Sequence, residues 1–230
     1  MIGSMSPDFS YFLPTGLARA STHDMQGILI FCWPVGLALW LLYVHLLERP
    51  TIELLPAAWR DRVTPSDRSL SFKALALASL AVILGAVTHV VWDAFTHTNT
   101  FITNTFPVLR TELFEHHGRA VRVFFMLQIL SSIGGLFALW LWALNLRHRE
   151  PRIRAADPPA SFLTDRERIL AALAIVVAAG ASALLAYANN SDAGLRTRFF
   201  ELLIGGMTGW FLAWCVVAVL ITRTAIAGRR

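Results

Sequence analysis

A carboxylate stands between two histidines at the end of a long apolar segment of this chain. His89, Asp93 and His97 follow one another at intervals of four residues, and residues 74–91 are almost wholly apolar. In a helix, residues four apart lie on the same face, one turn above the other. Ionisable side chains are costly at membrane depth, and there they usually mark a functional site. The three residues therefore predict a metal or catalytic site on a membrane helix.

Neighbouring members of this trio can bind one ion, but a straight helix does not allow all three to do so. His89 and Asp93 are one turn apart, and so are Asp93 and His97. The two histidines would lie about 12 Å apart along the helix axis. Three alternatives remain: the helix ends near Thr96 and His97 folds back, two metal ions bind, or one residue supports a ligand without touching the metal.

The composition of the chain is that of a membrane protein. Of its 230 residues, 56% are hydrophobic and 15% charged, and the mean hydropathy is +0.56. Soluble domains carry about 25% charged residues. The sequence contains no nucleotide-binding glycine motif, no Cys-x-x-Cys pair and no internal repeat. Its two cysteines, Cys32 and Cys215, lie in apolar runs, where we expect them to pack in the core.

Five apolar segments are long enough to cross a bilayer of about 30 Å. We therefore predict an all-α fold, a polytopic helical membrane protein with one integral-membrane domain over residues 1–230. The predicted spans cover residues 27–47, 72–95, 119–146, 169–188 and 200–222. Pro34 predicts a kink in the first of them.

The two longest connections differ in character. After the first span, Ile52, Leu55 and Trp59 recur at helical spacing, which favours a short interfacial helix over a free loop. Residues 147–168 are basic and contain prolines, which indicates a solvated cytoplasmic linker.

Basic residues predict the orientation of the chain. Most of the 20 Lys and Arg residues follow the first span, lie in the 147–168 linker, or stand at the C-terminus. The positive-inside rule places these segments in the cytoplasm. We expect a multi-pass protein of the plasma (inner) membrane with a cytoplasmic C-terminus. The net charge of +5 mostly reflects this topology, with some attraction to anionic lipid, and it requires no nucleic-acid partner. We expect membrane lipid as the partner.

This orientation gathers ionisable residues on the non-cytoplasmic side, although they are far apart in sequence. His23 and Asp24 precede the first span, Asp93 and His97 end the second, and a histidine pair at 116–117 precedes the third. A lone histidine in a span is as well explained by core packing, but the grouping favours a metal site. For the pair at 116–117 we expect a solvated loop.

Four motifs follow one another along the chain: GSMSPDFSYFL at residues 3–13, THDMQGILIFCWPVG at 22–36, ERPTIELLP at 48–56 and THVVWDAFTH at 88–97. In this order they resemble the DUF4184 family of bacterial integral-membrane proteins over essentially the whole chain. That family is more distantly similar to inner-membrane metal-dependent hydrolases. Those hydrolases share a His, Pro-Asp, Thr-His and His-x-x-x-Asp signature, loosely similar to that of zinc-dependent phospholipase C.

The resemblance implies a metal site made by Asp8, His23, His89 and Asp93, with His97 alongside. By its own context, the turn-like Ser-Pro-Asp sequence, Asp8 serves equally well as a helix cap. If one ion is bound, the side-chain N and O atoms of His23, His89 and Asp93 should lie about 3–5 Å from each other.

Family members generally begin further upstream, with a Ser-His-containing segment that leads into the GSM-x-PD motif. Either the start lies upstream of Met1, or this member has lost a ligand. Because a free terminus frays, we expect Asp8 to be poorly anchored or to lack a partner. Metal affinity should rise when the upstream segment is restored.

The ligand types define the expected chemistry. Imidazole and carboxylate together favour a divalent ion such as zinc, with manganese or iron as alternatives, over calcium or magnesium. A catalytic zinc keeps an open position and lowers the pKa of a bound water. Asp24 is then the candidate catalytic general base. Because the site lies near the outer headgroups, an ester or phosphoester that is lipid-linked or lipid-like is the expected substrate.

Three classes of function fit these observations. The first is a membrane-embedded metal-dependent hydrolase. The second is a metal-binding or structural membrane protein without catalysis. The third is a transporter, which should show repeats and broken helices in matched positions; apart from Pro34 the sequence shows neither.

Overall fold

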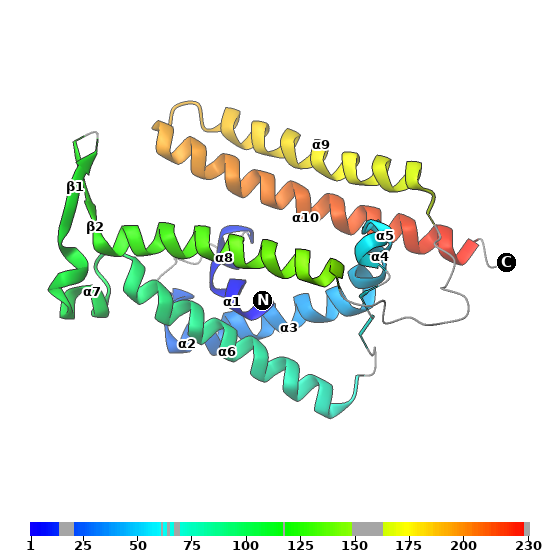
Figure 1. The fold of residues 1–230 in the computed structure, drawn as a ribbon, viewed down its shortest axis with the longest axis horizontal. Helices are drawn as coiled ribbons and strands as arrows, with labels where there is room; N and C mark the ends of the chain where they lie inside the picture. The colour runs from blue at the N-terminus through cyan, green and yellow to red at the C-terminus, as the bar shows by residue number, and fades with distance from the viewer. Residues whose placement is uncertain are drawn as a thin grey trace. The chain divides into compact units, whose positions relative to one another are not determined.

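The chain divides into two compact units, each with its own core. The computed structural model describes residues 1–13, 21–60, 62–63, 65–66, 70–116, 118–148 and 163–227. Unit 1 comprises residues 1–10, 15–37 and 71–149, and unit 2 comprises residues 11–14, 38–70 and 150–230. The elements of both units are shown in Figure 1.

Five helical segments are long and apolar enough to cross a membrane, which confirms the predicted fold class. In the described part of the chain they are Met25–Leu54, Phe72–Thr105, Val123–Leu146, Asp165–Asn189 and Leu195–Thr224. Large apolar side chains such as Leu136, Val177 and Leu203 remain exposed along them. Apolar surface of this extent is covered by lipid in a membrane. The chain is therefore a multi-pass helical membrane protein.

The elements of unit 1 follow one another from the N-terminus. They are helix α1 (Ile2–Met5), the 3₁₀ helix η1 (Ser6–Tyr11), α2 (Met25–Gly27), the π-helical turn η3 (Ile28–Cys32), the first half of α3 (Trp33–Leu42), α6 (Phe72–Thr96), α7 (Phe101–Thr105), the 3₁₀ helix η5 (Pro107–Arg110), strands β1 (Glu112–His116) and β2 (Arg119–Arg122), and α8 (Val123–His148). Ile28, Phe31, Cys32 and Ala86 form the buried core between η3 and α6. Cys32 is fully buried there, as its apolar context predicted.

The second span, α6, has a clear start and a clear end. The Ser71 hydroxyl accepts a hydrogen bond from the Ala74 amide and caps the helix. The helix ends at Thr96, where His97 takes an extended backbone conformation with ψ of 152°. Asn99 then adopts a positive φ of 60°, and Thr100 caps α7. The helix end near Thr96 that one of the three alternatives required is therefore present.

The first span is longer and less regular than predicted. The irregularity near Pro34 takes the form of the π-helical turn η3, directly before α3. A second π-helical turn, η4 (Tyr43–Leu47), leads into α4 (Glu48–Leu54). The separate short helix is α5 (Ala57–Arg60). Helix rather than loop was the right prediction after the first span, but residues 48–54 continue the span. Pro50 does not end the helix, because it lies in the first turn of α4, directly after the π-helical turn η4.

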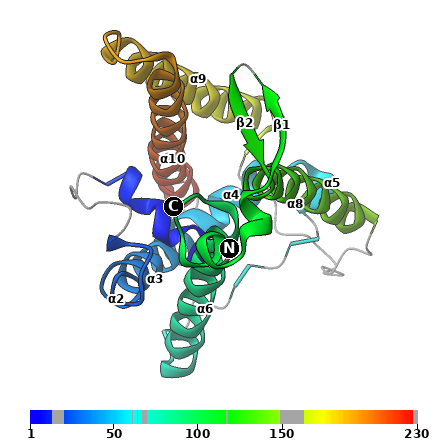
Figure 2. The same cartoon turned by 90° about the vertical axis from the view of Figure 1, so that its left-hand side faces the viewer.

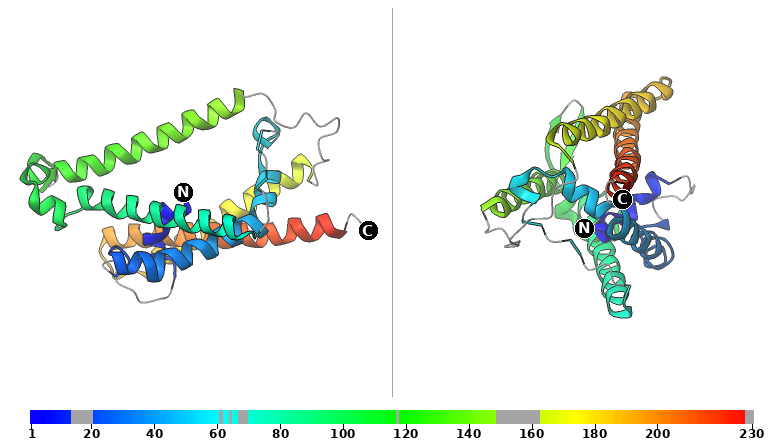
Figure 3. Two further views of the ribbon diagram at one scale, coloured as in Figure 1. Left: turned by 90° about the horizontal axis from the view of Figure 1, so that it is seen from below. Right: turned by 90° about the vertical axis from the view of Figure 1, so that its right-hand side faces the viewer.

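Unit 2 is dominated by an antiparallel pair of long helices, α9 (Asp165–Asn189) and α10 (Leu195–Ala227), seen side by side in Figures 1 and 3. Thr164 and Glu167 form a capping box that starts α9. Gly205 and Gly209 on α10 let the backbones approach so closely that an added Cβ would lie 2.8–2.9 Å from carbonyl oxygens of α9. Of the predicted linker, residues 149–162 lie outside the described residues.

A short β-hairpin precedes the third membrane helix, where the sequence prediction had placed the start of the helix at residue 119. Strands β1 and β2 pair antiparallel, and Gly118 between them has a positive φ of 72°. Figure 2 shows the hairpin extending away from the end of α8. The helix itself begins at Val123. The prediction missed the strands because the short Arg-Ala-Val-Arg segment shows no alternation of polar and apolar residues and leads directly into the apolar run behind it.

Candidate metal centre

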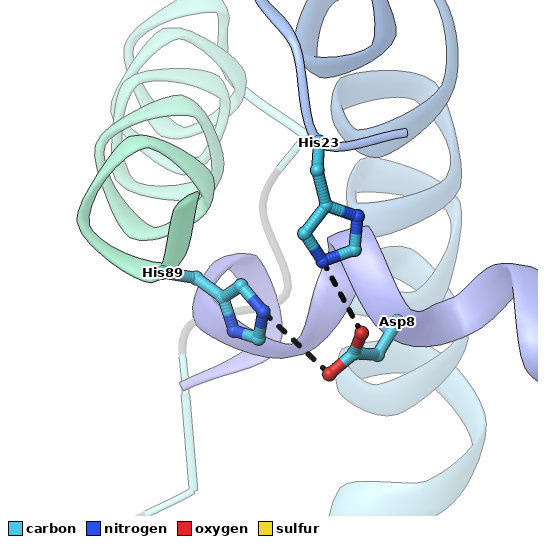
Figure 4. Close-up of side chains that lie close together, drawn as sticks. All are labelled: Asp8, His23 and His89. Carbon is cyan, nitrogen blue, oxygen red and sulfur yellow. Dashed lines mark ion pairs between the residues drawn. The ribbon is translucent and has the colours of Figure 1, made fainter. Parts of the chain in front are cut away.

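Two histidines and two aspartates converge inside unit 1. His23 Nε2 lies 3.4 Å from Asp8 Oδ1 and 3.4 Å from Asp93 Oδ2. His89 Nε2 lies 3.5 Å from Asp8 Oδ2 and 3.4 Å from Asp93 Oδ2. Each imidazole therefore faces both carboxylates, and we call these four residues the His/Asp cluster. Figure 4 shows the two imidazoles pointing at Asp8 from separate segments of the chain.

Close backbone packing brings the N-terminal segment to α6. A Cβ on Gly85 would lie 2.7 Å from the Ser4 amide nitrogen, and a Cβ on Gly3 would lie 2.5 Å from the Val82 carbonyl oxygen. Only glycine allows α1 and α6 to approach so closely. Gly85 lies one turn before His89, on the same face of α6. This close contact between α1 and α6 therefore places the N-terminal segment beside His89.

A backbone carbonyl fixes the protonation pattern of His89. Its Nδ1 lies 2.6 Å from the Ser4 carbonyl oxygen, which can only accept a hydrogen bond. Nδ1 therefore carries a proton and donates it to Ser4. In the neutral imidazole, Nε2 then presents its lone pair to the oxygens of Asp8 and Asp93. Because a lone pair and a carboxylate repel each other, a proton or a metal ion must lie between them.

Asp8 is well anchored, so the prediction that it lacks a partner or is poorly held is wrong. The residues just before it, Ser6 and Pro7, are fully buried, and the Ser6 hydroxyl donates to the Gly3 carbonyl. Its carboxylate meets both imidazoles. The side chain of Asp8 is nevertheless 40% exposed, compared with 16% for Asp93. The Asp8 side is the open side of the His/Asp cluster.

His23 is held by the segment that enters the first span. Its Nδ1 lies 3.0 Å from the hydroxyl of Thr22, a fully buried residue. The Cys32 thiol in turn donates to the Thr22 carbonyl oxygen at 3.4 Å. These contacts connect the loop that carries His23 to the core of unit 1.

His97 lies beside Asp93 rather than among the converging imidazoles. Its Nδ1 is 3.5 Å from Asp93 Oδ1, on the opposite oxygen from the one that faces His23 and His89. The Gln128 amide nitrogen on α8 lies 3.4 Å from His97 Nε2. Among the three sequence alternatives for the trio, this geometry favours support of a ligand by His97. Gln128 therefore belongs to the surroundings of the site.

The Asp24 side chain caps a helix. Its carboxylate accepts a hydrogen bond from the Gly27 amide at 2.6 Å and caps α2. The ligand atoms that all lie within 4.8 Å of one another in the described residues belong to Asp8, His23 and His89, without Asp24. Asp93 is not part of that mutually close group, although its Oδ2 lies 3.4 Å from each of the two imidazoles. Of the histidine pair, His116 lies on β1 and residue 117 lies outside the described residues.

The spacing and charge of the His/Asp cluster fit a divalent ion. Hydrogen bonds between N and O atoms are about 2.7–3.2 Å long, and the four contacts are 3.4–3.5 Å. Ligand atoms on a tetrahedral ion at 2.0–2.1 Å are about 3.3 Å apart. Two carboxylates also neutralise a divalent charge, which matters at the edge of a low-dielectric membrane. The donor set of two imidazoles and two carboxylates suits zinc, manganese or iron.

Fold and site together define a class: multi-pass helical membrane proteins with a histidine–aspartate cluster where the N-terminal segment meets a membrane helix. The model of the family described as a domain of unknown function, DUF4184, matches residues 1–220, and the chain belongs to this family. The resemblance in the four sequence motifs is thereby confirmed. Comparisons with curated proteins and with solved structures gave no match.

Proposed function

We propose that the protein is a membrane-embedded metal-dependent hydrolase that acts on an ester or phosphoester of a lipid-like or lipid-linked substrate. Asp8, His23, His89 and Asp93 hold a divalent ion, and His97 orients Asp93. Zinc is the expected ion, with manganese or iron as alternatives. The observation that carries the proposal is the pair of imidazoles between two carboxylates, with His89 Nε2 left to accept a cation by the hydrogen bond from Nδ1 to Ser4.

The chemistry follows from the ligands and from their exposure. A zinc ion held by these four residues would take a water as a fifth ligand, lower the pKa of that water and polarise the scissile ester or phosphoester. The exposed side of Asp8 is where water and substrate reach the site. Asp24 remains the candidate general base for the water, in addition to its role as helix cap. Because lipid surrounds the membrane spans, a substrate with an apolar chain that holds it in the membrane is favoured.

The test is chelator-sensitive hydrolysis by the purified protein. In detergent micelles doped with a chromogenic phosphodiester that carries an acyl chain, the zinc-loaded protein should hydrolyse the probe. Removing the metal with a chelator should abolish the activity, and added zinc should restore it. Zinc bound in stoichiometric amount without hydrolysis of ester or phosphoester probes would favour the non-catalytic metal-binding class instead.

The variant Asp24→Asn separates capping from catalysis within the same assay. Asparagine caps a helix as well as aspartate does, but it is not a base. A general base contributes about 10²–10⁴-fold to a rate. Hydrolysis should therefore fall by that order while zinc content stays unchanged. Full activity of Asp24→Asn would assign this carboxylate to the cap alone.

We further propose that the His/Asp cluster faces the non-cytoplasmic side of the plasma membrane, with the C-terminus in the cytoplasm. The excess of basic residues near the other ends of the spans supports this orientation. A cysteine introduced at Asn99 or Asn190 should react with an impermeant thiol reagent in intact cells. A cysteine at Ala156 should react only after permeabilisation. The reverse pattern of labelling would invert the orientation.

A further inference from the structure

Exposed apolar side chains gather on the segment between the second and third membrane helices. Phe101 on α7 is 83% exposed, and Val108 on η5 is 65% exposed. Phe106, Leu113 and Phe114 are each about half exposed. A connection in water would not leave five large apolar residues uncovered within so short a stretch.

The position of the hairpin formed by β1 and β2 limits what can cover these residues. Strand β2 ends at Arg122 and α8 starts at Val123, so the hairpin begins where a membrane helix ends. The hairpin runs crosswise to α8 in Figures 1 and 2. A helix that crosses the bilayer near its normal then places the hairpin along the membrane surface. The bilayer is thus the surface that the chain connectivity places next to the hairpin.

The hairpin has two different faces. Phe114 pairs with Val121 across the strands, and His116 pairs with Arg119 two positions nearer the turn. Residues two apart on a strand share a face, so an apolar pair and a basic pair lie on one face. Glu115, which pairs with Ala120, lies on the other. Apolar side chains with an adjacent arginine suit the boundary between acyl chains and phosphate headgroups.

We infer that the Phe114 face of the hairpin docks on the surface of the lipid bilayer. Phe114 and Val121 enter the headgroup boundary, and Arg119 meets lipid phosphate. Asp93 and His97 stand at the end of α6 that leads through α7 to the hairpin. Docking therefore holds the lipid surface at the same end of unit 1 as the His/Asp cluster. This inference rests on the hairpin alone and does not depend on the proposed hydrolase activity.

The test measures the depth of single residues in vesicles. Phe114→Cys and Glu115→Cys are labelled with a small environment-sensitive fluorophore and reconstituted into phosphatidylcholine vesicles. The unsubstituted chain, with Cys32 and Cys215, gives the background labelling. A nitroxide-bearing lipid, with the nitroxide near the headgroup, should quench the label at position 114 several-fold more than the label at position 115. Aqueous iodide should show the opposite preference.

Two outcomes would overturn the inference. Equal iodide quenching at both positions would place the whole hairpin in water. Self-quenching at position 114 that grows with the ratio of protein to lipid would place a second copy of the chain on this face. Retained helical circular dichroism in both variants shows that the comparison is made on folded protein. Because no step of the test measures hydrolysis or metal, its failure is distinct from failure of the proposed function.

Discussion

The variant His89→Ala is expected to lose stoichiometric metal binding. His89 Nε2 lies 3.4–3.5 Å from both carboxylates of the His/Asp cluster, so the substitution removes a central donor and leaves two carboxylates facing a gap. Loss of a residue that only supports a metal ligand costs about 10–100-fold in affinity, and loss of a ligand costs at least as much. Metal analysis of the purified protein after dialysis against zinc measures the effect directly.

The matched control for this prediction is His45→Ala. His45 is exposed on η4 in unit 2 and is not a member of the His/Asp cluster, so His45→Ala makes the same chemical change without removing a cluster residue. It should retain the zinc content of the unsubstituted protein. His23→Ala should behave like His89→Ala, because its imidazole faces the same two carboxylates. If His89→Ala keeps its zinc while His45→Ala loses it, the metal binds elsewhere, and protons occupy the His/Asp cluster.

Apolar length predicted the membrane helices well, since a membrane span is defined by one property of a continuous segment. The helical spacing of His89 and Asp93 likewise predicted their shared face, because four residues make about one turn. The bounds of the first span were less predictable. Its helix continues through Glu48, whose carboxylate is buried and accepts hydrogen bonds from Ser66, a contact that no local pattern reveals.

The assembly of the site depends on contacts between distant segments, which a single sequence encodes only indirectly. Asp8 entered the predicted site through the family resemblance, and His23 through the predicted orientation as well as the resemblance. The structure shows which contacts bring both to α6. The Ser4 carbonyl that orients His89 carries no signal in its residue type, because any residue supplies a carbonyl. Gly85 did carry a signal: a glycine one turn before a membrane histidine indicates close approach of another segment. Close approach of another segment at Gly85 could have been predicted from it, but the identity of that segment, Gly3 and Ser4, comes from the structure.

The variant Gly85→Ala is expected to weaken zinc binding by about 10–100-fold, the range for residues that position a metal ligand. The added methyl group would meet backbone atoms only: the Ser4 nitrogen at 2.7 Å and the Gly3 carbonyl carbon at 2.8 Å. Backbone cannot rotate away as a side chain can, so α1 must move. That movement breaks the hydrogen bond from His89 to Ser4 and withdraws Asp8, which follows α1 directly. Competition with a chromophoric zinc chelator measures the affinity.

A matched substitution separates this effect from a general loss of folding. Gly134→Ala makes the same change on α8 of the same unit, where nothing lies within 4 Å of the added Cβ. Alanine favours helix over glycine by about 1 kcal/mol, so both variants should retain full helical circular dichroism. Only Gly85→Ala should lose zinc affinity. Unchanged affinity in Gly85→Ala would mean that α1 does not lie against α6, and Ser4 could then not orient His89. The argument that His89 presents a lone pair to a cation would lose its physical basis.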